Sequence, residues 1–285
     1  MAITIYRCEC KQELALDDTM CPACGRKDFP LPNVRRALDP IETGALKARY
    51  KSAYAASRDQ GTTRLLAALL KTASGSKAVK AMGIATLHVN LLNKDLIKSF
   101  YRRGSRINTQ DPHSLSRETS DTWANPGYHH LLVQAALSAN ELGCRWYGSC
   151  HLVFRSESIA SRASVFWENP RTLFAKVSSN DALSAPPGHR ATWENRSRLA
   201  IAKLHDRIQA DTRCESFSAL FIEPRIDPTS DFIEVQIYGD VAISAVEKIT
   251  ICKETMDDTD LESIDVVVRK LAGLKIESQV IDAYP

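Results

Sequence analysis

Apolar residues recur at helical spacing in the first part of the chain that follows residue 32. The repeated positions are Leu46, Tyr50, Ala53, Tyr54 and Ser57, and then Leu65, Leu66, Leu69 and Leu70. The sequence Ser74-Gly75-Ser76 is typical of a helix end. This spacing predicts two or three helices between residues 33 and 82.

From residue 83 onward the pattern changes to short apolar runs separated by polar loops, which is typical of an α+β domain. The predicted strands are 84–90, 149–155, 163–168, 217–223, 232–238, 247–252 and 275–281. The predicted helices are 93–103, with Asn93 as cap and Gly104 as stop, and 128–142, 194–210 and 260–272. Long polar loops at 104–127 and 176–192 separate them, and loops of that length are often functional.

A short stiff segment, Pro30-Leu31-Pro32, separates a cysteine-containing N-terminus from these elements. The sequence therefore predicts a small module at 1–32, a helical segment at 33–82 and an α+β domain at 83–285.

The composition is that of a globular chain with an ample core: of its 285 residues 44% are hydrophobic and 25% are charged. A net charge of +3 is too small to indicate nucleic-acid binding by itself. Apolar runs such as 65–70 are too short to cross a bilayer, and the N-terminus lacks the order of a signal peptide. We therefore expect a cytoplasmic protein with no membrane partner.

Four of the eight cysteines have the spacing of metal ligands: Cys8, Cys10, Cys21 and Cys24. Four thiolates satisfy a tetrahedral zinc ion without a water ligand, which defines a closed, structural site. Gly25 directly after the second pair permits the tight turn that such a site needs. The spacing thus predicts a zinc ribbon, whereas Cys144, Cys150, Cys214 and Cys252 are scattered as reduced thiols usually are.

Basic residues flank this module at Arg7, Lys11, Arg26, Lys27, Arg35 and Arg36. They favour either a polyanion partner or a solvated basic face, and the sequence does not separate the two.

Four segments together resemble a family of bacterial proteins with a T-x-H strand, a Y-G-S-C-H strand, an R-x-S-x-F strand and an E-x-Q-I-Y-G strand, in that order. They are Thr86-Leu87-His88, the run 147–151, the run 162–166 and the run 234–239. This order is similar to that of toxin-type mono-ADP-ribosyltransferases. The sequence departs from that pattern at His88, which lacks a following Gly-Thr, and at Glu234, which stands in E-x-Q order.

The resemblance implies a split β-sheet domain that binds NAD as a substrate and transfers ADP-ribose to a macromolecule, as a toxin or a phage-defence effector. It implies Glu234 and Gln236 as catalytic residues, and His88, Tyr147 and Ser149 around the dinucleotide. The acceptor would be a macromolecule, with RNA or DNA favoured over protein, and an antitoxin or immunity protein would be a further partner.

Taken without the family, the strand 232–238 places Glu234 and Gln236 on one face because side chains alternate along a strand. They form the floor of a polar site or, alternatively, the solvated face of an antiparallel strand. Arg102 and Arg106 suit a pyrophosphate, although a basic helix end complementing the dipole explains them nearly as well.

His88 is by itself as consistent with a structural histidine as with a ligand contact, and Tyr147 with a turn that leads into a strand. His129, His130, Cys144, Cys150 and His151 offer a second metal site, but no tight ligand pair supports one.

The sequence has no phosphate-binding glycine loop, no H-E-x-x-H and no G-x-S-x-G, which argues against several common enzyme classes. The alternative to a transferase is a binding protein in which the ribbon docks on nucleic acid or protein. A metal-dependent nuclease would need an acidic cluster that the sequence lacks.

Overall fold

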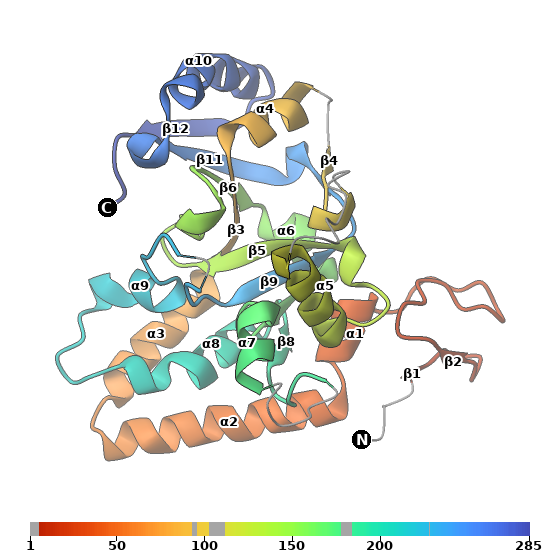
Figure 1. Cartoon of the computed structure of the whole chain (residues 1–285). Helices are drawn as coiled ribbons and strands as arrows, with labels where there is room; N and C mark the ends of the chain where they lie inside the picture. Colours follow the sequence, from red (N-terminus) through yellow and green to blue (C-terminus); the bar gives the residue numbers. More distant parts are fainter. Residues whose placement is uncertain (1–5, 93–95, 103–111, 178–183, 228) are drawn as a thin grey trace.

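The computed structural model of the chain describes residues 6–92, 96–102, 112–177, 184–227 and 229–285 (Figure 1). Its N-terminal hairpin of β1 (Tyr6–Arg7) and β2 (Glu13–Leu14) projects from one side of the molecule. Three helices follow, α1 (Pro32–Ala37), α2 (Pro40–Asp59) and α3 (Thr63–Gly75). The Asp39 side chain caps α2 by accepting a hydrogen bond from Ile41 N at 2.8 Å. The prediction of two or three helices between residues 33 and 82 is confirmed.

A mixed sheet of eight strands forms the centre of the described chain, in the order β12-β11-β6-β3-β5-β9-β7-β8. Strands β11 and β12 are parallel, and the other neighbours are antiparallel. A separate small pair joins β4 (Leu96–Ile97) to β10 (Val241–Ala242). The strands of the large sheet are β3 (Lys77–Met82), β5 (Leu132–Ser138), β6 (Cys150–Phe154), β7 (Ala163–Phe166), β8 (Arg190–Thr192), β9 (Glu234–Tyr238), β11 (Val246–Cys252) and β12 (Glu277–Ile281).

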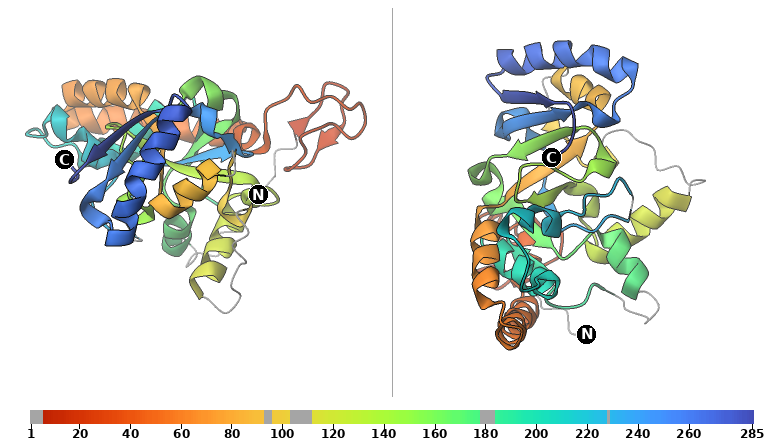
Figure 2. Two further views of the ribbon diagram at one scale, coloured as in Figure 1. Left: turned by 90° about the horizontal axis from the view of Figure 1, so that it is seen from above. Right: turned by 90° about the vertical axis from the view of Figure 1, so that its left-hand side faces the viewer.

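Helices cover the sheet from both sides. Figure 2 shows α2 and α3 on one side, and α5 and α7 on the other. One hydrophobic core joins Leu46 and Leu66 of the first helices to Val235 and Ile249 of the sheet. The fold is thus a mixed α+β arrangement. The remaining helices are α4 (Ile84–Leu92), α5 (Pro112–Ala124), α6 (Ser156–Ile159), α7 (Pro170–Val177), α8 (Arg196–Leu204), α9 (Phe217–Phe221) and α10 (Asp258–Gly273).

The segment 84–90 is helical, so the predicted strand there is wrong. Ile84, Leu87 and Leu91 are the buried residues of α4, and their spacing of three and four is that of a helix face. The β-branched residues of this segment suggested a strand, but tertiary burial decides in favour of the helix. His88 therefore lies on a helix.

The segment 128–142 was predicted to be a helix and instead contains β5, which lies between β3 and β9 in the sheet. Most residues of β5 are buried, so its apolar residues run without the alternation that marks a half-exposed strand. The predicted strand at 217–223 begins as α9, whose buried residues are Phe217 and Phe221.

Three further differences concern the loops and the helical segment. In the predicted helix 93–103, the described residues form β4 and a single 3-10 turn, whereas Asn93 and Gly104 lie outside the described residues. Strand β3 occupies the end of the segment 33–82, and α5 occupies part of the predicted loop 104–127. The strands predicted at 149–155, 163–168, 232–238, 247–252 and 275–281 and the helices at 194–210 and 260–272 are confirmed.

Candidate functional site

The sheet splits between its two central strands. Lys77, Ala78 and Val79 of β3 pair with β5, and the pairing then stops while β3 continues to Met82. Beyond this point the Lys80 Nζ atom bridges the gap by donating to the Gln134 carbonyl oxygen at 2.9 Å. A gap between central strands exposes backbone and side chains that a continuous sheet would cover.

A cavity of about 230 Å³ lies at this split. The end of β3 forms one wall, β5 and β9 form another, and α4, α5 and the turn before β6 close it. Its lining residues are Val79, Lys80, Ala81, Met82, Gly83, Thr86, Phe100, Arg117, Gln134, Ala135, Ala136, Cys144, Tyr147, Phe232 and Glu234.

Gly148 fixes the turn that carries Tyr147 to the cavity. Its φ of 134° is unfavourable for other residues, and an added Cβ would lie 2.2 Å from the Met82 carbonyl carbon. Only glycine lets this turn pack on the end of β3. Tyr147 remains 37% exposed, its ring contacts that of Phe232 edge-on, and its hydroxyl accepts a hydrogen bond from Asn169 Nδ2 at 2.9 Å.

Glu234 is the buried carboxyl group of the cavity, with only 2% of its surface exposed. Gln236 lies one pleat further along β9 and donates from Nε2 to Glu234 Oε1 at 2.9 Å. Desolvation, followed by the charge of Asp121, raises the pKa of Glu234 to about 8, against the hydrogen bond from Gln236 and the cations Arg117 and Lys80. Glu234 is therefore largely protonated at neutral pH.

Gln236 holds Glu234 and is not among the residues that line the cavity. Its own strand is fixed by Asn33 of α1, whose Nδ2 donates to the Gln236 carbonyl oxygen at 2.8 Å and to Ser164 Oγ at 3.2 Å. Gln236 thus acts on the cavity through Glu234.

Arg117 of α5 is the main cavity residue that the sequence did not indicate. Its guanidinium group lies 4.1 Å from the ring centroid of Phe100 and donates to Gln134 Oε1 at 2.7 Å. Its Nε atom lies 3.5 Å from Asp121 Oδ2, which also accepts from Tyr101 Oη at 2.7 Å. The contacts hold a cation in a fixed orientation at the cavity wall, as anion recognition requires.

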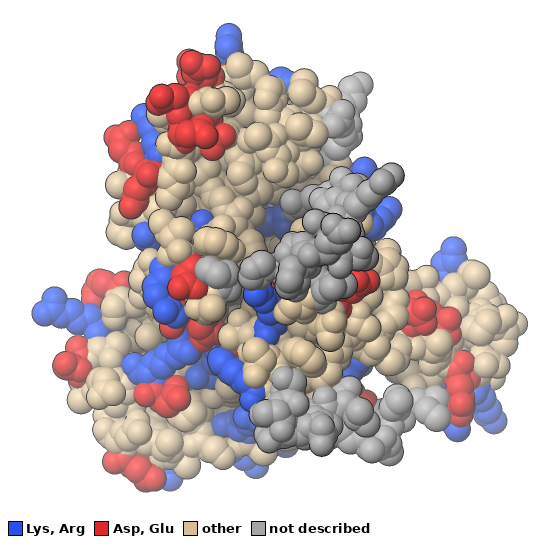
Figure 3. Space-filling view, in the orientation of Figure 1, with Lys and Arg blue, Asp and Glu red and all other residues tan. Residues whose placement is uncertain are grey.

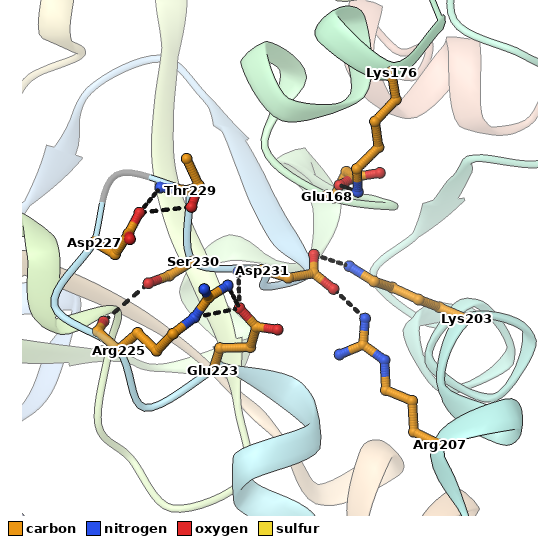
Figure 4. Close-up of polar contacts among 10 residues, drawn as sticks. All are labelled: Glu168, Lys176, Lys203, Arg207, Glu223, Arg225, Asp227, Thr229, Ser230 and Asp231. Carbon is orange, nitrogen blue, oxygen red and sulfur yellow. Dashed lines mark hydrogen bonds and ion pairs between the residues drawn. The ribbon is translucent and has the colours of Figure 1, made fainter.

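Ion pairs fix the segment that leads into β9 (Figure 4). Asp231 accepts from Lys203 Nζ at 2.6 Å and also pairs with Arg207, both on or just after α8. Glu223 accepts from Asp231 N at 3.0 Å and pairs with Arg225. Lys203 and Asp231 are nearly buried, so these bonds set where β9, and with it Glu234, begins.

Among the predicted dinucleotide contacts that the structure describes, only Tyr147 lines the cavity. His88 lies two residues beyond Thr86 on α4 and is not a lining residue. Ser149 is buried, and its carbonyl oxygen accepts from Cys252 N at 2.9 Å. Arg102 forms an ion pair with Asp240 at 2.9 Å away from the cavity lining. Arg106 lies outside the described residues.

The second polar site is the cysteine cluster. All four sulfur atoms lie within 4.8 Å of one another, with Cys8 and Cys24 3.6 Å apart and Cys10 and Cys21 3.5 Å apart. Zinc–sulfur bonds of about 2.3 Å place tetrahedral sulfurs ~3.8 Å apart, so the cluster could bind such an ion with little movement. Within the described ranges it is the only group of three or more potential metal ligands, and the second site considered at His129 to His151 does not form.

Arg35 attaches this module to the body of the protein. Its guanidinium group donates to the carbonyl oxygens of Ala15, Leu16 and Asp18, at 2.8, 2.8 and 3.2 Å. It also stacks over the rings of Tyr6 and Phe29. Because Arg35 is buried in these contacts, it belongs to neither a solvated face nor a polyanion site.

Two other arginines of the module are paired with acids. Arg7 pairs with Glu13 at 2.8 Å, and Arg26 pairs with Glu9 and Asp28. Figure 3 shows acidic and basic side chains side by side over the module, at the right of the view. The basic residues of the module therefore give it little net positive potential.

No helix within the described ranges has both the length and the apolar character needed to cross a bilayer. No protein-family model matches the chain, and no curated protein is significantly similar to it.

Proposed function

We propose that the protein cleaves the N-glycosidic bond of NAD at the split cavity and transfers ADP-ribose to a macromolecular acceptor. The observation that carries the proposal is a buried carboxyl group, Glu234, on the floor of a cavity between the central strands of a split sheet. The Glu234 carboxyl group, the Tyr147 ring and the Arg117 guanidinium group all line this cavity, and together they suit one end of a dinucleotide.

The size of the cavity indicates which end it would hold. Ligand pockets usually have volumes of roughly 300–1,000 Å³, and this cavity measures about 230 Å³. It has room for nicotinamide and its ribose, and the pyrophosphate would then extend outward. Arg117 on the wall is the group that we assign to the pyrophosphate, and Tyr147 at the exposed edge is the group that we assign to the nicotinamide ring.

In the proposed reaction the bond between ribose C1′ and the nicotinamide nitrogen breaks, and nicotinamide leaves with the electron pair. The positive charge that develops on the ribose is stabilised by the Glu234 carboxylate, which is held by Gln236 before the reaction begins. An acceptor nucleophile then forms a new bond to C1′ and loses its proton to solvent.

The raised pKa of Glu234 has a direct consequence for this role, because only the ionised form stabilises a cation. We therefore expect the rate of the chemical step to rise with pH until about pH 8.

For the N-terminal module we propose a zinc ribbon that binds one structural ion through Cys8, Cys10, Cys21 and Cys24. Four sulfur ligands leave no open position on the metal, so its role is to fold the module rather than to take part in transfer.

The test is incubation of cell extract with NAD labelled in its adenine ring, with wild-type protein, with Glu234→Gln and with Glu262→Gln as a control on α10. The expected result is label in protein, RNA or DNA with wild type and the control, and about 100-fold less with Glu234→Gln. Equal labelling by Glu234→Gln would contradict the proposal. Absence of any NAD turnover, together with steeply salt-dependent nucleic-acid binding, would instead favour the non-catalytic binding module.

A further inference from the structure

The helical hairpin of α2 and α3 is rich in positive charge. Residues 40–75 contain six Lys and Arg residues and two acidic residues, a net charge of +4, whereas the whole chain has +3. One of those two acids, Glu42, is buried, and its pKa is raised by desolvation. Residues 40–75 thus carry more net positive charge than the whole chain, and the rest of the chain sums to a slightly negative charge.

The cations of α2 lie on one face of the helix. Lys47, Lys51 and Arg58 are separated by four and seven residues, so at 100° per residue they fall within a sector of about 40°. All three are exposed, and none forms an ion pair with the described residues. At 1.5 Å per residue the row is about 16 Å long.

The next helix, α3, adds Arg64 and Lys71, seven residues apart and both exposed. Figure 2 shows the two helices side by side on one side of the sheet. Helix α10 provides a contrast, because Arg269 and Lys270 are outnumbered there by Asp258, Asp260, Glu262 and Asp265. Acidic side chains accordingly gather over α10 at the upper left of Figure 3.

On one side of the α2 cations most of the exposed residues are small, and Asp59 is the acidic residue among them. Gly44, Ala48, Ser52 and Ala55 are exposed and occupy the adjoining sector of the helix. Small residues allow a phosphate backbone to approach the helix closely, and the cations beside them then reach the phosphate oxygens. Insertion into a membrane surface would need large apolar residues on this face, and Ile41 at the start of α2 is the only large hydrophobic residue of either helix with a clearly exposed side chain.

From this arrangement we infer that the hairpin of α2 and α3 binds the phosphate backbone of nucleic acid through Lys47, Lys51, Arg58, Arg64 and Lys71. Contacts from these side chains to phosphate oxygens carry no sequence information, so the binding that we infer is independent of sequence. The inference does not depend on NAD cleavage, and it places the nucleic-acid contact on the helices rather than on the cysteine module.

Binding is measured by fluorescence anisotropy with a labelled 20-base-pair DNA duplex and a matching RNA duplex, without NAD, over a series of salt concentrations. Five phosphate contacts give a slope of log affinity against log salt of about −4.5. In the triple variant Lys47→Gln, Lys51→Gln and Arg58→Gln the slope is expected to fall to about −2, with at least a roughly tenfold loss of affinity at low salt.

The control is Arg269→Gln, Lys270→Gln and Lys275→Gln, which removes the same charge from α10 and the residues after it and should weaken binding less than about twofold. Circular dichroism establishes that both variants fold. Absence of binding to either duplex at low salt, or equal weakening by both triple variants, would overturn the inference. Tighter binding to anionic lipid vesicles or to poly-glutamate than to either duplex would overturn it as well.

Discussion

The cysteine cluster and the cavity at the sheet split are both polar sites, but they are assembled over very different distances along the chain. The four sulfurs come from residues 8 to 24, whereas the cavity combines Lys80 and Arg117 with Glu234. The first site is set by local turns, and the second is set by the order of the strands. A site of the first kind keeps its geometry if the sheet changes, whereas a site of the second kind depends on every strand that separates its members.

The largest effect is expected from removing one ligand of the local site. Cys21 is fully buried at the centre of the module, so Cys21→Ser should abolish stable zinc binding. Structural zinc contributes roughly 10 kcal/mol or more to the folding of such modules. Metal analysis of purified protein should give one zinc per chain in wild type and in the control Cys214→Ser, and none in Cys21→Ser. If Cys21→Ser still cleaves NAD, the cavity works without the metal-bound module, and the two sites are independent.

The next largest effect is on the free energy of unfolding, which should depend on pH through Glu234 in the cavity. The folded-state pKa of Glu234 is raised to about 8, so between its ordinary value and pH 8 the folded state holds a proton that the unfolded state has lost. Stability due to this group is present at acid pH and falls by up to about 1.4 kcal/mol per pH unit as pH rises through this window. Glu234→Gln removes this loss and should be the more stable protein at pH 8, with little difference near pH 4.5.

Urea unfolding of wild type and Glu234→Gln at several pH values measures this difference. A variant that is less stable than wild type at pH 8 would show that the carboxyl group is favourably ionised in the folded protein, and would remove the physical basis of its raised pKa.

A smaller effect is expected from the cation on the cavity wall. Arg117→Met keeps an apolar stem on Phe100 but removes the guanidinium group, so the KM for NAD should rise about 10- to 100-fold, which corresponds to roughly 1.4–2.8 kcal/mol. Arg269→Met on α10 serves as the control and should leave KM unchanged. An unchanged KM in Arg117→Met would mean that the pyrophosphate binds elsewhere.

The last effect, which is of similar size, concerns the contact between the cysteine module and the body of the protein. Arg35→Met removes the donors to three carbonyl oxygens of the module and should cost about 1–3 kcal/mol in its attachment while leaving the metal bound. Hydrogen exchange should therefore rise between residues 12 and 19 in Arg35→Met but not in Arg36→Met. Loss of metal in Arg35→Met would show that the local site depends on the body after all.

The cysteine cluster and strand β9 could be predicted from the sequence, whereas strand β5 could not, and each outcome has its own physical cause. The cysteine cluster was predictable because its ligands and its turn lie within a few residues of one another. Strand β9 was predictable because β-branched residues alternate with Glu234 and Gln236. Strand β5 was not, because a strand that is buried on both faces has no alternation, and its Leu and Ala residues are equally good helix formers.

Arg117 could not have been found from local pattern. It lies on α5 in a polar stretch, and its partners Phe100 and Gln134 are each 17 residues away along the chain. Only the topology that brings α5 onto β5 defines its role. His88 shows the converse, because a motif suggested a strand residue facing a ligand, and the burial of Ile84, Leu87 and Leu91 turned the segment into a helix.

In the function that we propose, the ionised Glu234 carboxylate drives cleavage of NAD in the split cavity. The most direct test is the rate of nicotinamide release by purified protein between pH 6 and pH 9, for wild type and Glu234→Gln. The wild-type rate should rise nearly tenfold per pH unit and level off near pH 8. The Glu234→Gln rate should be about 100-fold lower at pH 8 and independent of pH. Nicotinamide release by Glu234→Gln at the wild-type rate across this range would contradict this proposal.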